Sequence, residues 1–557
     1  TPYGADELLA KETMDDESEK LRHFHDWLLV NRVELRGCTI KYRDQSKGFG
    51  IVSSPTGTNI VNERVLLVVP LDLAITPMRV IQDPLIGPEC RAMFEEGEVD
   101  DRFLIILFLL LEHLRKHSTW KPYLDMLPRS FGSPLWFNDQ ELHELKGTAL
   151  YRATELQKKQ LLSIFHDKVE GLIKKLLVKD GYSESVVRFE DFLWANSVFW
   201  TRAMNIPFPH SYVFPKTIDV EPSCSETSKN ETPAENGSMI FKSDVLVDSK
   251  SSELTPDETV WVEGIIPGID FCNHDVKAQA TWEIDGAGTK TGVPFSMFLQ
   301  SAVETPFKID QDISISYGNK GNEELLYLYG FVIDNNPDDY LMINYPIEAL
   351  KHSSFSETRM QLLEAQKAEL RYLLPKSLLH HGFTSMDSNQ VEQLHYNIAD
   401  KQWSSHHKVP SYVNNLLFPE GLLTTLRTIA MEENELCQVQ SLLEQEVGCG
   451  QRQPTDEEVS AAVREACGDS GACQLLVNLL QTKLMDLEEG SGSEDCDTKL
   501  LDEHKMLEKM DQSDLKIKSL GIKTWSSIVY RRGQKQLARL FLREAEQALQ
   551  LCFSQDN

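Results

Sequence analysis

Residues 267–275 of this chain read PGIDFCNHD, and a second stretch downstream, residues 313–318, reads ISISYG. The second stretch alternates apolar and polar residues, which is typical of a half-buried strand, and it ends at Gly318, where a turn costs little. Residues 323–329 then predict a short helix with Asn322 as its N-cap. Each feature alone is weak evidence, because an Asn–His pair is more often a polar corner and a terminal tyrosine is more often a packing residue.

Short apolar runs around these stretches predict further strands. They lie at residues 39–42, 49–52, 65–70, 280–284 and 295–303. Residues 47–50 read KGFG between the first two runs. A lone G-x-G of this kind is most simply a tight hairpin, so its position matters more than its letters.

Helical periodicity dominates the remainder of the chain. We expect helices at residues 19–30, 101–114, 141–145, 156–177, 189–203, 360–374, 421–431 and 519–551. Ser354 and Glu357 have the spacing of a capping box ahead of the helix at 360–374. The longest apolar run has nine residues, 103–111, whereas a bilayer span takes about 20. It therefore predicts a buried helix and no membrane span.

Composition describes an ordinary globular protein with an acidic surface. Of the 557 residues, 41% are hydrophobic and 25% charged, which suffices for a sizeable core in several domains. The net charge of −30 argues against direct binding to nucleic acid, which needs clustered Lys and Arg. The ten cysteines include no C-x-x-C pair, so neither a zinc site nor a disulfide framework is expected.

Taken together and in this order, KGFG, PGIDFCNHD, ISISYG and the YGF at residues 329–331 resemble the SET domain. This is the fold of one class of S-adenosylmethionine-dependent protein methyltransferases. The helical region at 81–200 resembles the insert of one subfamily, which contains plant Rubisco large-subunit lysine methyltransferase (LSMT) and animal actin-histidine methyltransferase. The resemblance covers residues 20–345 well and 346–557 loosely, and it leads us to expect a plant protein.

The resemblance implies a fold and a domain order. The fold is α+β: short β-sheets interrupted by a helical insert, followed by an all-α substrate-binding domain. The expected boundaries are a flexible acidic N-terminus at 1–18, the N-terminal part of the SET domain at 19–80, the helical insert at 81–200, the C-terminal part at 201–345 and the helical domain at 346–557. Residues 216–258 are rich in Ser and Thr and lack any period, so we expect a disordered loop there.

The resemblance also implies which residues act. Those implied to contact S-adenosyl-L-methionine are Gly48, Gly50, Glu63, Asn273, His274 and Tyr317. Those implied to bind the substrate are Arg202, Asp270 and Tyr329. Tyr317 is also the implied catalytic residue, lining the methyl-transfer channel, and no metal is needed. The register around Glu63 is one residue off the family pattern, which makes that assignment weaker.

The function that follows is methyl transfer from S-adenosylmethionine to a lysine of a non-histone protein. A histidine acceptor, a histone-lysine acceptor and a SET-fold scaffold without catalysis are the alternatives. The scaffold is disfavoured because the glycines, Asn273, His274 and Tyr317 are all in place. We expect a monomeric intracellular protein that binds a protein substrate. A chloroplast location is favoured, with the cytoplasm and nucleus as alternatives.

Overall fold

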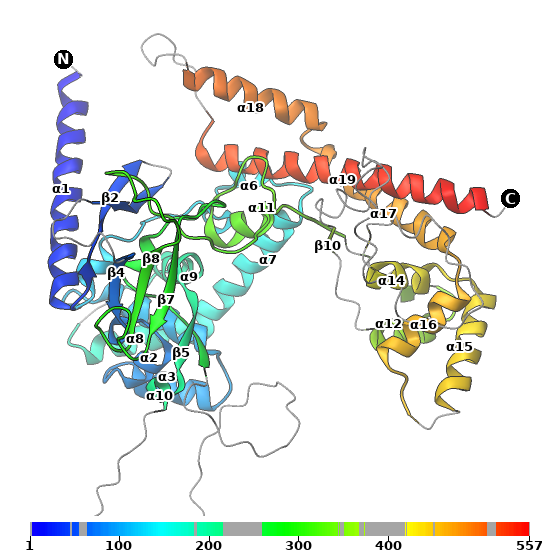
Figure 1. Cartoon of the computed structure of the whole chain (residues 1–557), viewed down its shortest axis with the longest axis horizontal. Coiled ribbons are helices and arrows are strands. Elements are labelled where there is room, and N and C mark those ends of the chain that lie inside the picture. Colours follow the sequence, from blue (N-terminus) through cyan, green and yellow to red (C-terminus); the bar gives the residue numbers. More distant parts are fainter. Residues whose placement is uncertain are drawn as a thin grey trace, which may run out of the picture. The chain divides into compact units, whose positions relative to one another are not determined.

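The structure is a computed structural model, shown in Figure 1. It describes residues 3–44, 47–54, 64–182, 186–214, 259–343, 345, 350–351, 353–366, 372–373, 418, 420–448, 452–509 and 520–555. These fall into two compact units. The first comprises Thr1–Leu127, Ile173–Val187 and Arg202–Ser316, and the second comprises Pro128–Leu172, Arg188–Thr201 and Tyr317–Asn557. The region predicted as the helical insert contributes to both units, and the predicted domain boundaries stay predictions.

The first unit contains the larger sheets. Its strands are β1 (Glu34–Leu35), β2 (Cys38–Asp44), β3 (Gly48–Ser53), β4 (Val65–Pro70), β5 (Met204–Pro209), β6 (Thr259–Gly264), β7 (Ala280–Asp285) and β8 (Ser296–Ser301). Its helices and 3-10 turns are α1 (Tyr3–Val30), η1 (Leu71–Leu73), α2 (Pro77–Gln82), α3 (Gly87–Glu95), α4 (Asp101–Leu114), α5 (Lys121–Leu124), α10 (His210–Val213) and η4 (Ile269–Phe271). Two helices, α8 (Glu170–Lys179) and α9 (Phe189–Arg202), continue from one unit into the other.

An antiparallel four-stranded sheet in the order β1–β4–β8–β7 forms the centre of this unit (Figure 1). β4 is an inner strand whose Leu67, Val68 and Val69 are fully buried, which explains why its sequence is continuously apolar. The hairpin β2–β3 and the antiparallel pair β5–β6 complete the strands of the unit. β2, β3, β4, β7 and β8 match the predicted runs, whereas β1, β5 and β6 were not predicted.

Helices of the first unit also follow the sequence pattern. α4 occupies the predicted range, and the carboxylate of Asp100 caps it by accepting a hydrogen bond from the backbone N of Phe103 at 2.9 Å. α1 ends at Val30 as expected but begins at Tyr3, not near residue 19. No proline interrupts residues 3–30, and acidic residues suit the positive end of a helix dipole, so the acidic segment expected to be flexible continues the helix.

The second unit is mainly helical. Its helical elements are η2 (Pro134–Trp136), α6 (Asp139–His143), α7 (Ala149–Ile164), the π-helical turn η3 (Phe165–Val169), α11 (Asn322–Glu324), the π-helical turn η5 (Leu325–Tyr329), α12 (Ser356–Ala365), α14 (Glu420–Ala430), α15 (Glu433–Val447), α16 (Asp456–Ala466), α17 (Asp469–Glu489), α18 (Glu494–Lys509) and α19 (Ile522–Gln555). Two short strands, β9 (Leu341–Met342) and β10 (Tyr372–Leu373), pair antiparallel.

Hydrophobic clusters stabilise the second unit, and the three largest join its helices. One packs α14, α17 and α19 around fully buried Leu476, Leu480 and Phe541. Another packs α6 and the start of α19 around fully buried Leu145 and Tyr530. A third joins α12, α15 and α16. The long helices α17 and α19 lie side by side in Figure 1.

Two predicted helix starts in the second unit are wrong. Asn322 does not cap its helix: Gly321 occupies the N-cap, while the Asn322 side chain donates to the carbonyl of Ile333 and accepts from its backbone N, both at 2.9 Å. The Ser354/Glu357 capping box is absent, because Phe355, in a left-handed conformation, occupies the N-cap position of α12. In both cases a contact distant in sequence or an unusual backbone conformation overrides the local motif.

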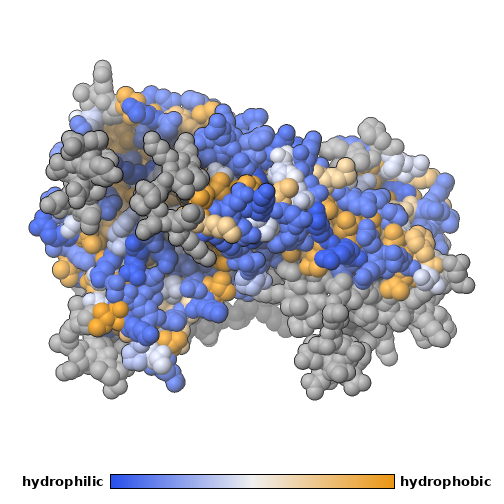
Figure 2. All heavy atoms as spheres, turned by 90° about the horizontal axis from the view of Figure 1, so that it is seen from above, coloured by the Kyte–Doolittle hydropathy of each residue, from blue (hydrophilic) through white to orange (hydrophobic). Residues whose placement is uncertain are grey.

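The surface agrees with the acidic composition. Figure 2 shows one face on which hydrophilic residues predominate and hydrophobic residues occur in small groups. Among the described residues, no helix is both long and apolar enough to cross a bilayer. The predicted loop at 216–258 lies outside the described residues.

Candidate active site

Gly48 and Gly50 lie in the β2–β3 hairpin, at the first and third positions of β3. Gly48 has a φ of +62°, a left-handed conformation that favours glycine, and an added Cβ there would meet no described atom within 4 Å. The turn before it is closed by Asp44, whose carboxylate accepts a hydrogen bond from the backbone N of Lys47 at 2.8 Å. The backbone at Gly48 is therefore held in place and open toward its missing side chain.

Gly50 is buried and contacts a residue far away in sequence. A Cβ added at Gly50 would lie 2.8 Å from Nδ2 of Asn273, closer than real Cβ atoms approach other heavy atoms. A larger residue at this position would therefore force the Asn273 side chain to move. The G-x-G segment and the Asn-His segment, singled out separately in the sequence, meet here.

The segment containing Ile313 and Ile315 runs between these two parts. The backbone N of Ile313 donates to the carbonyl of Ile51 in β3, at 2.8 Å. On its other side, the backbone N of Ile315 donates to the carbonyl of Asn273 at 3.0 Å, and His274 pairs with Ile315 in a parallel bridge. The predicted strand here is thus a pair of isolated bridges, although both isoleucines are buried as the alternation required.

Asp270 is the centre of a buried polar group. Its Oδ2 accepts hydrogen bonds from the hydroxyl of Tyr123 at 2.7 Å and from Nη1 of Arg202 at 2.8 Å. Its Oδ1 accepts from the backbone N of Gly268 at 2.9 Å, and the side chain has no exposed surface. Burial raises the pKa of Asp270, and the neighbouring Arg202 opposes that rise.

This environment couples Asp270 to Arg202. Both carboxylate oxygens accept hydrogen bonds from internal donors, and the predicted contact of Asp270 with the substrate stays a prediction. Asp270 fixes Arg202, whose guanidinium also lies 4.8 Å from the ring centroid of Phe271. Removing one partner of such a buried pair costs about 3–5 kcal/mol, so Arg202 is held firmly.

In the second unit, the predicted site residues Tyr317 and Tyr329 lie together with Phe331 of the YGF motif. The ring centroids of Tyr317 and Tyr329 are 5.0 Å apart, and Phe331 lies 6.5 Å from Tyr317 and 6.2 Å from Tyr329. All three are partly exposed. Burial raises the pKa of Tyr329, so its hydroxyl stays protonated at neutral pH.

A close backbone contact fixes the end of this aromatic group. Gly330, between Tyr329 and Phe331, has a φ of +79°, and a Cβ added to it would lie 2.6 Å from the backbone N of Ser133. A Cβ added to Gly132 would lie 2.1 Å from the carbonyl oxygen of Gly330. The two glycines therefore allow two backbones to touch, which sets the directions of the side chains on either side of Gly330.

Lys320 lies beside the aromatic group. Its ammonium is 5.9 Å from the ring centroid of Tyr329 and 2.5 Å from Oε1 of Glu324. A cation at this distance from a tyrosine ring is attracted by the negative face of the ring. The pair thus places one positive and one negative charge at the edge of the tyrosines.

The structure brings together some of the predicted residues within each unit and leaves others undescribed. Gly50 meets Asn273, Asp270 meets Arg202, and Tyr317 meets Tyr329, whereas Glu63 lies outside the described residues. Sequence reasoning missed Tyr123, Gly132 and Lys320. Only Lys320, which follows the Tyr-Gly pair closely, had a signal in the sequence.

In the described part of the chain, no three His, Cys, Asp or Glu side chains are grouped as metal ligands would be.

No family model matches the chain. It is similar to curated enzymes, however. The chloroplastic [fructose-bisphosphate aldolase]-lysine N-methyltransferase of Arabidopsis thaliana is 27% identical over 63% of this chain and 59% of the enzyme. The human actin-histidine N-methyltransferase is 23% identical over 57% of this chain and 43% of the enzyme. The chain thus spans about half the length of these relatives.

A solved structure extends the likeness to nearly the whole chain. The SET domain of LSMT bound to lysine and AdoHcy superposes with a TM-score of 0.58 at 18% identity, covering 96% of this chain and 92% of the other. At that identity the likeness establishes the fold. The chain therefore has the SET-domain fold followed by a helical C-terminal region, and the predicted fold class and resemblance are confirmed.

Proposed function

We propose that this chain is an S-adenosylmethionine-dependent protein-lysine N-methyltransferase that acts on a non-histone protein. The observation that carries the proposal is the contact between Gly50 and the Asn273 side chain. This contact joins the G-x-G and Asn-His segments, and Gly48, in the same strand as Gly50, leaves its backbone open. The relatives support methylation of a non-histone protein, since the Arabidopsis enzyme methylates lysine of an aldolase and the human enzyme methylates histidine of actin.

The residues fit the cofactor. At Gly48 no described atom occupies the space where a side chain would stand. At Gly50 the absence of a side chain lets the backbone approach the amide of Asn273. Asn273 and His274 are both partly exposed. When bound, S-adenosylmethionine supplies the activated methyl group as a sulfonium. Gly48, Gly50, Asn273 and His274 would hold it.

The remaining task for the protein is to present a neutral acceptor nitrogen in line with the methyl group. Deprotonating a lysine of ordinary pKa 10.4 at pH 7.4 costs about 4 kcal/mol in water. Aromatic walls made by Tyr317, Tyr329 and Phe331 would lower that cost, because an apolar surrounding disfavours the ammonium. We assign the Tyr317 hydroxyl to orienting the acceptor, and Tyr329 to lining its path.

On the substrate side we assign Arg202 as the contact residue and Asp270 as the residue that positions it. The side chain of Arg202 is 12% exposed, whereas that of Asp270 is wholly enclosed. Asp270 and Phe271 fix the orientation of the Arg202 guanidinium. Arginine in this setting suits a carboxylate or a peptide carbonyl.

Histidine is the second candidate acceptor, and the observation that favours it is the likeness to an actin-histidine enzyme. Because imidazole is already mostly neutral at pH 7.4, the same catalytic residues serve either acceptor. We further propose a monomer located in the chloroplast, in line with the location given for the Arabidopsis relative. The substrate protein is unspecified by these residues.

Binding of S-adenosylhomocysteine, measured by calorimetry in the presence of a chelator, tests the proposal. We expect one site per chain and no effect of the chelator. Asn273→Ala should weaken binding at least tenfold, which corresponds to about 1.4 kcal/mol. Asn478→Ala, at an exposed position of α17, is the matched control and should bind normally. Absence of binding by the unaltered chain, or its loss on chelation, contradicts the proposal.

A further inference from the structure

The helices α17 and α19 form an antiparallel pair whose register is fixed by contacts near both ends. Near the start of α17, Cys473 meets Cys552 near the end of α19. Just past the end of α17, Ser491 and Gly492 meet Lys535. The two contacts are separated by roughly 25 Å along each helix, at 1.5 Å per residue. Together they fix the register of the two helices.

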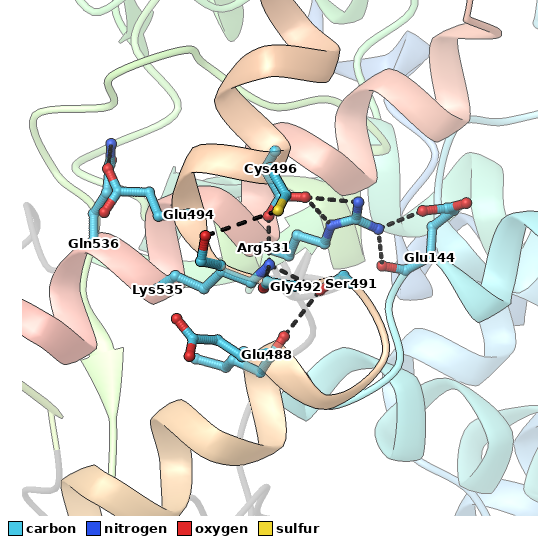
Figure 3. Close-up of polar contacts among 12 residues, drawn as sticks. Glu144, Glu488, Ser491, Gly492, Glu494, Cys496, Arg531, Lys535 and Gln536 are labelled. Carbon is cyan, nitrogen blue, oxygen red and sulfur yellow. Dashed lines mark hydrogen bonds and ion pairs between the residues drawn. The ribbon is translucent and has the colours of Figure 1, made fainter.

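Figure 3 shows the contact at the Lys535 end, which we call the lysine clamp: Lys535, Asp497, Arg531, Ser491 and Gly492. The Lys535 ammonium is fully buried and donates to Ser491 Oγ at 2.8 Å, to the Gly492 carbonyl at 2.8 Å and to Asp497 Oδ2 at 2.6 Å. Arg531 donates to the other oxygen of Asp497 at 2.8 Å. With every ammonium proton used and both charges paired, this end of the helix pair is firmly closed.

The opposite end has two thiols in place of such a network. The sulfur atoms of Cys473 and Cys552 are 4.0 Å apart, and both residues are buried. Their cluster includes fully buried Ala548, one helical turn before Cys552, with Leu549 and Leu551 packed against it. A disulfide needs the sulfurs at about 2.05 Å, so an approach of about 2 Å closes the gap.

We propose that Cys473 and Cys552 form a reversible disulfide that locks the α17–α19 pair at the end opposite the lysine clamp. A low-molecular-weight disulfide such as oxidised glutathione is the oxidant. One protein thiolate attacks it, a glutathione thiol leaves, and the second protein thiolate displaces the other glutathione. The two cysteines lose two protons and two electrons in forming the S–S bond, and the oxidant takes up the electrons as it becomes two thiols.

The position of Cys552 provides the entry for this reaction. It lies in the last turn of α19, which ends at Gln555, and terminal turns open more readily than helix interiors. The neighbouring thiol and burial raise the pKa of Cys473. Because Cys552 lies in the terminal turn, its thiol is the first that the oxidant reaches. Once Cys552 carries the mixed disulfide, closure of the helix end brings it onto Cys473. The exposed Cys437 and Cys496 have no cysteine partner among the described residues.

The test equilibrates the full chain with reduced and oxidised glutathione at pH 8, quenches it with acid, and maps the products by non-reducing peptide mass spectrometry. We expect a peptide pair joined through Cys473 and Cys552. We also expect the thermal unfolding midpoint to rise by several degrees and to return on reduction, since the bond closes a loop of 79 residues' separation.

The variants separate this bond from other thiol chemistry. Cys473→Ser and Cys552→Ser should each abolish the shift in unfolding midpoint, whereas the double variant Cys437→Ser/Cys496→Ser should keep it. Each variant is compared with itself under reducing conditions, so any destabilisation by the substitution cancels. Glutathione attached to Cys437 or Cys496 while Cys473 and Cys552 stay reduced overturns the proposal. If Cys473 and Cys552 form the disulfide but the thermal unfolding midpoint is unchanged, the proposal that the bond locks the helix pair is overturned.

Discussion

Tyr317 and Tyr329 have rings in contact but are assigned different tasks, and removing one oxygen from each distinguishes them. Tyr317→Phe keeps the ring and takes away the hydroxyl that we assign to orienting the acceptor. We expect methyl-transfer turnover to fall by one to three decades, because a positioned hydrogen-bonding group at a reacting centre contributes about 2–4 kcal/mol. Affinity for S-adenosylhomocysteine should stay within a few-fold.

Tyr329→Phe is the matched comparison for that experiment and should cost less turnover, because its hydroxyl only lines the path. Single-turnover rates with a confirmed substrate provide the measurement. A Tyr317→Phe enzyme with normal turnover means that alignment alone drives the reaction, or that the reacting tyrosine lies elsewhere.

Gly50 offers a second test on one residue. Gly50→Ala places a methyl group 2.8 Å from Nδ2 of Asn273, so the amide must turn away. We expect the affinity for S-adenosylhomocysteine to fall at least tenfold while the chain stays folded. Gly171→Ala is the control, since a Cβ there meets nothing within 4 Å, and alanine suits a helix better than glycine by roughly 0.5–1 kcal/mol. Unaltered affinity of Gly50→Ala in calorimetry would place the cofactor away from Asn273.

The candidate residues themselves were predictable to different degrees. Asn273 and Gly50 could be found because each stands in a short motif whose order along the chain is informative. The hydrogen-bond partners of Asp270 could not, because one of them is Tyr123, 147 positions away, whose hydroxyl donates to the carboxylate. A contact between distant residues leaves no trace in local periodicity.

At the scale of elements, the segment from Asn322 to Tyr340 is organised by a buried carboxylate. Oδ1 of Asp339 accepts hydrogen bonds from the backbone N of Asn322 at 2.9 Å and of Tyr340 at 3.2 Å. Oδ2 faces α19, where a Cβ added at Gly533 would lie 3.0 Å from it. Burial raises the pKa of Asp339 to about 6, with the nearby Glu323 adding to the rise.

The sign of the resulting pH dependence is fixed. Above pH 6 the carboxylate is charged in both states, and the folded chain bears the full cost of burying it, about 3 kcal/mol for a two-unit rise above the ordinary value. As the pH falls from about 6 to below 4, the folded state takes up its proton first and that cost is relieved. Asp339 thus contributes to the free energy of unfolding more favourably at acid pH than at neutral pH.

Asp339→Asn should remove this dependence, because the amide oxygen can accept the same backbone hydrogen bonds without a charge. We expect the variant to be more stable than the parent by up to about 3 kcal/mol at pH 7.5, with the difference vanishing near pH 4. Urea unfolding across that range measures it. The exposed Asp456→Asn serves as the control and should show a small difference at each pH. A difference for Asp339→Asn that grows toward acid pH has the wrong sign for this account.

Element boundaries show where sequence patterns suffice. β4 and α4 were predicted to the residue because long apolar runs with clear ends determine them. The starts of α11 and α12 were not, because Asn322 binds the backbone of Ile333 and Phe355 adopts a left-handed conformation. Caps are decided by one or two hydrogen bonds, each worth about 1 kcal/mol, which tertiary contacts easily outweigh.

At the scale of the whole molecule, the chain passes repeatedly between its two compact units. The predicted insert supplies parts of both, and Tyr317 begins the last segment of the second unit while Asn273 belongs to the first. Sequence order along 557 residues could indicate a SET-type chain, since the motifs appear in the family order. It could not indicate how the insert is divided, because that depends on which helix faces pack together.

The central claim concerns the whole protein: that it transfers a methyl group from S-adenosylmethionine to a lysine side chain of another protein. The direct measurement incubates the chain with S-adenosylmethionine carrying an isotopically heavy methyl group and a protein extract. Mass spectrometry then locates the heavy methyl. We predict heavy methyl-lysine on one or a few non-histone proteins, greatly reduced with Tyr317→Phe. If the chain binds the cofactor but no protein acquires a heavy methyl group, or the label appears only on residues other than lysine, the claim is contradicted.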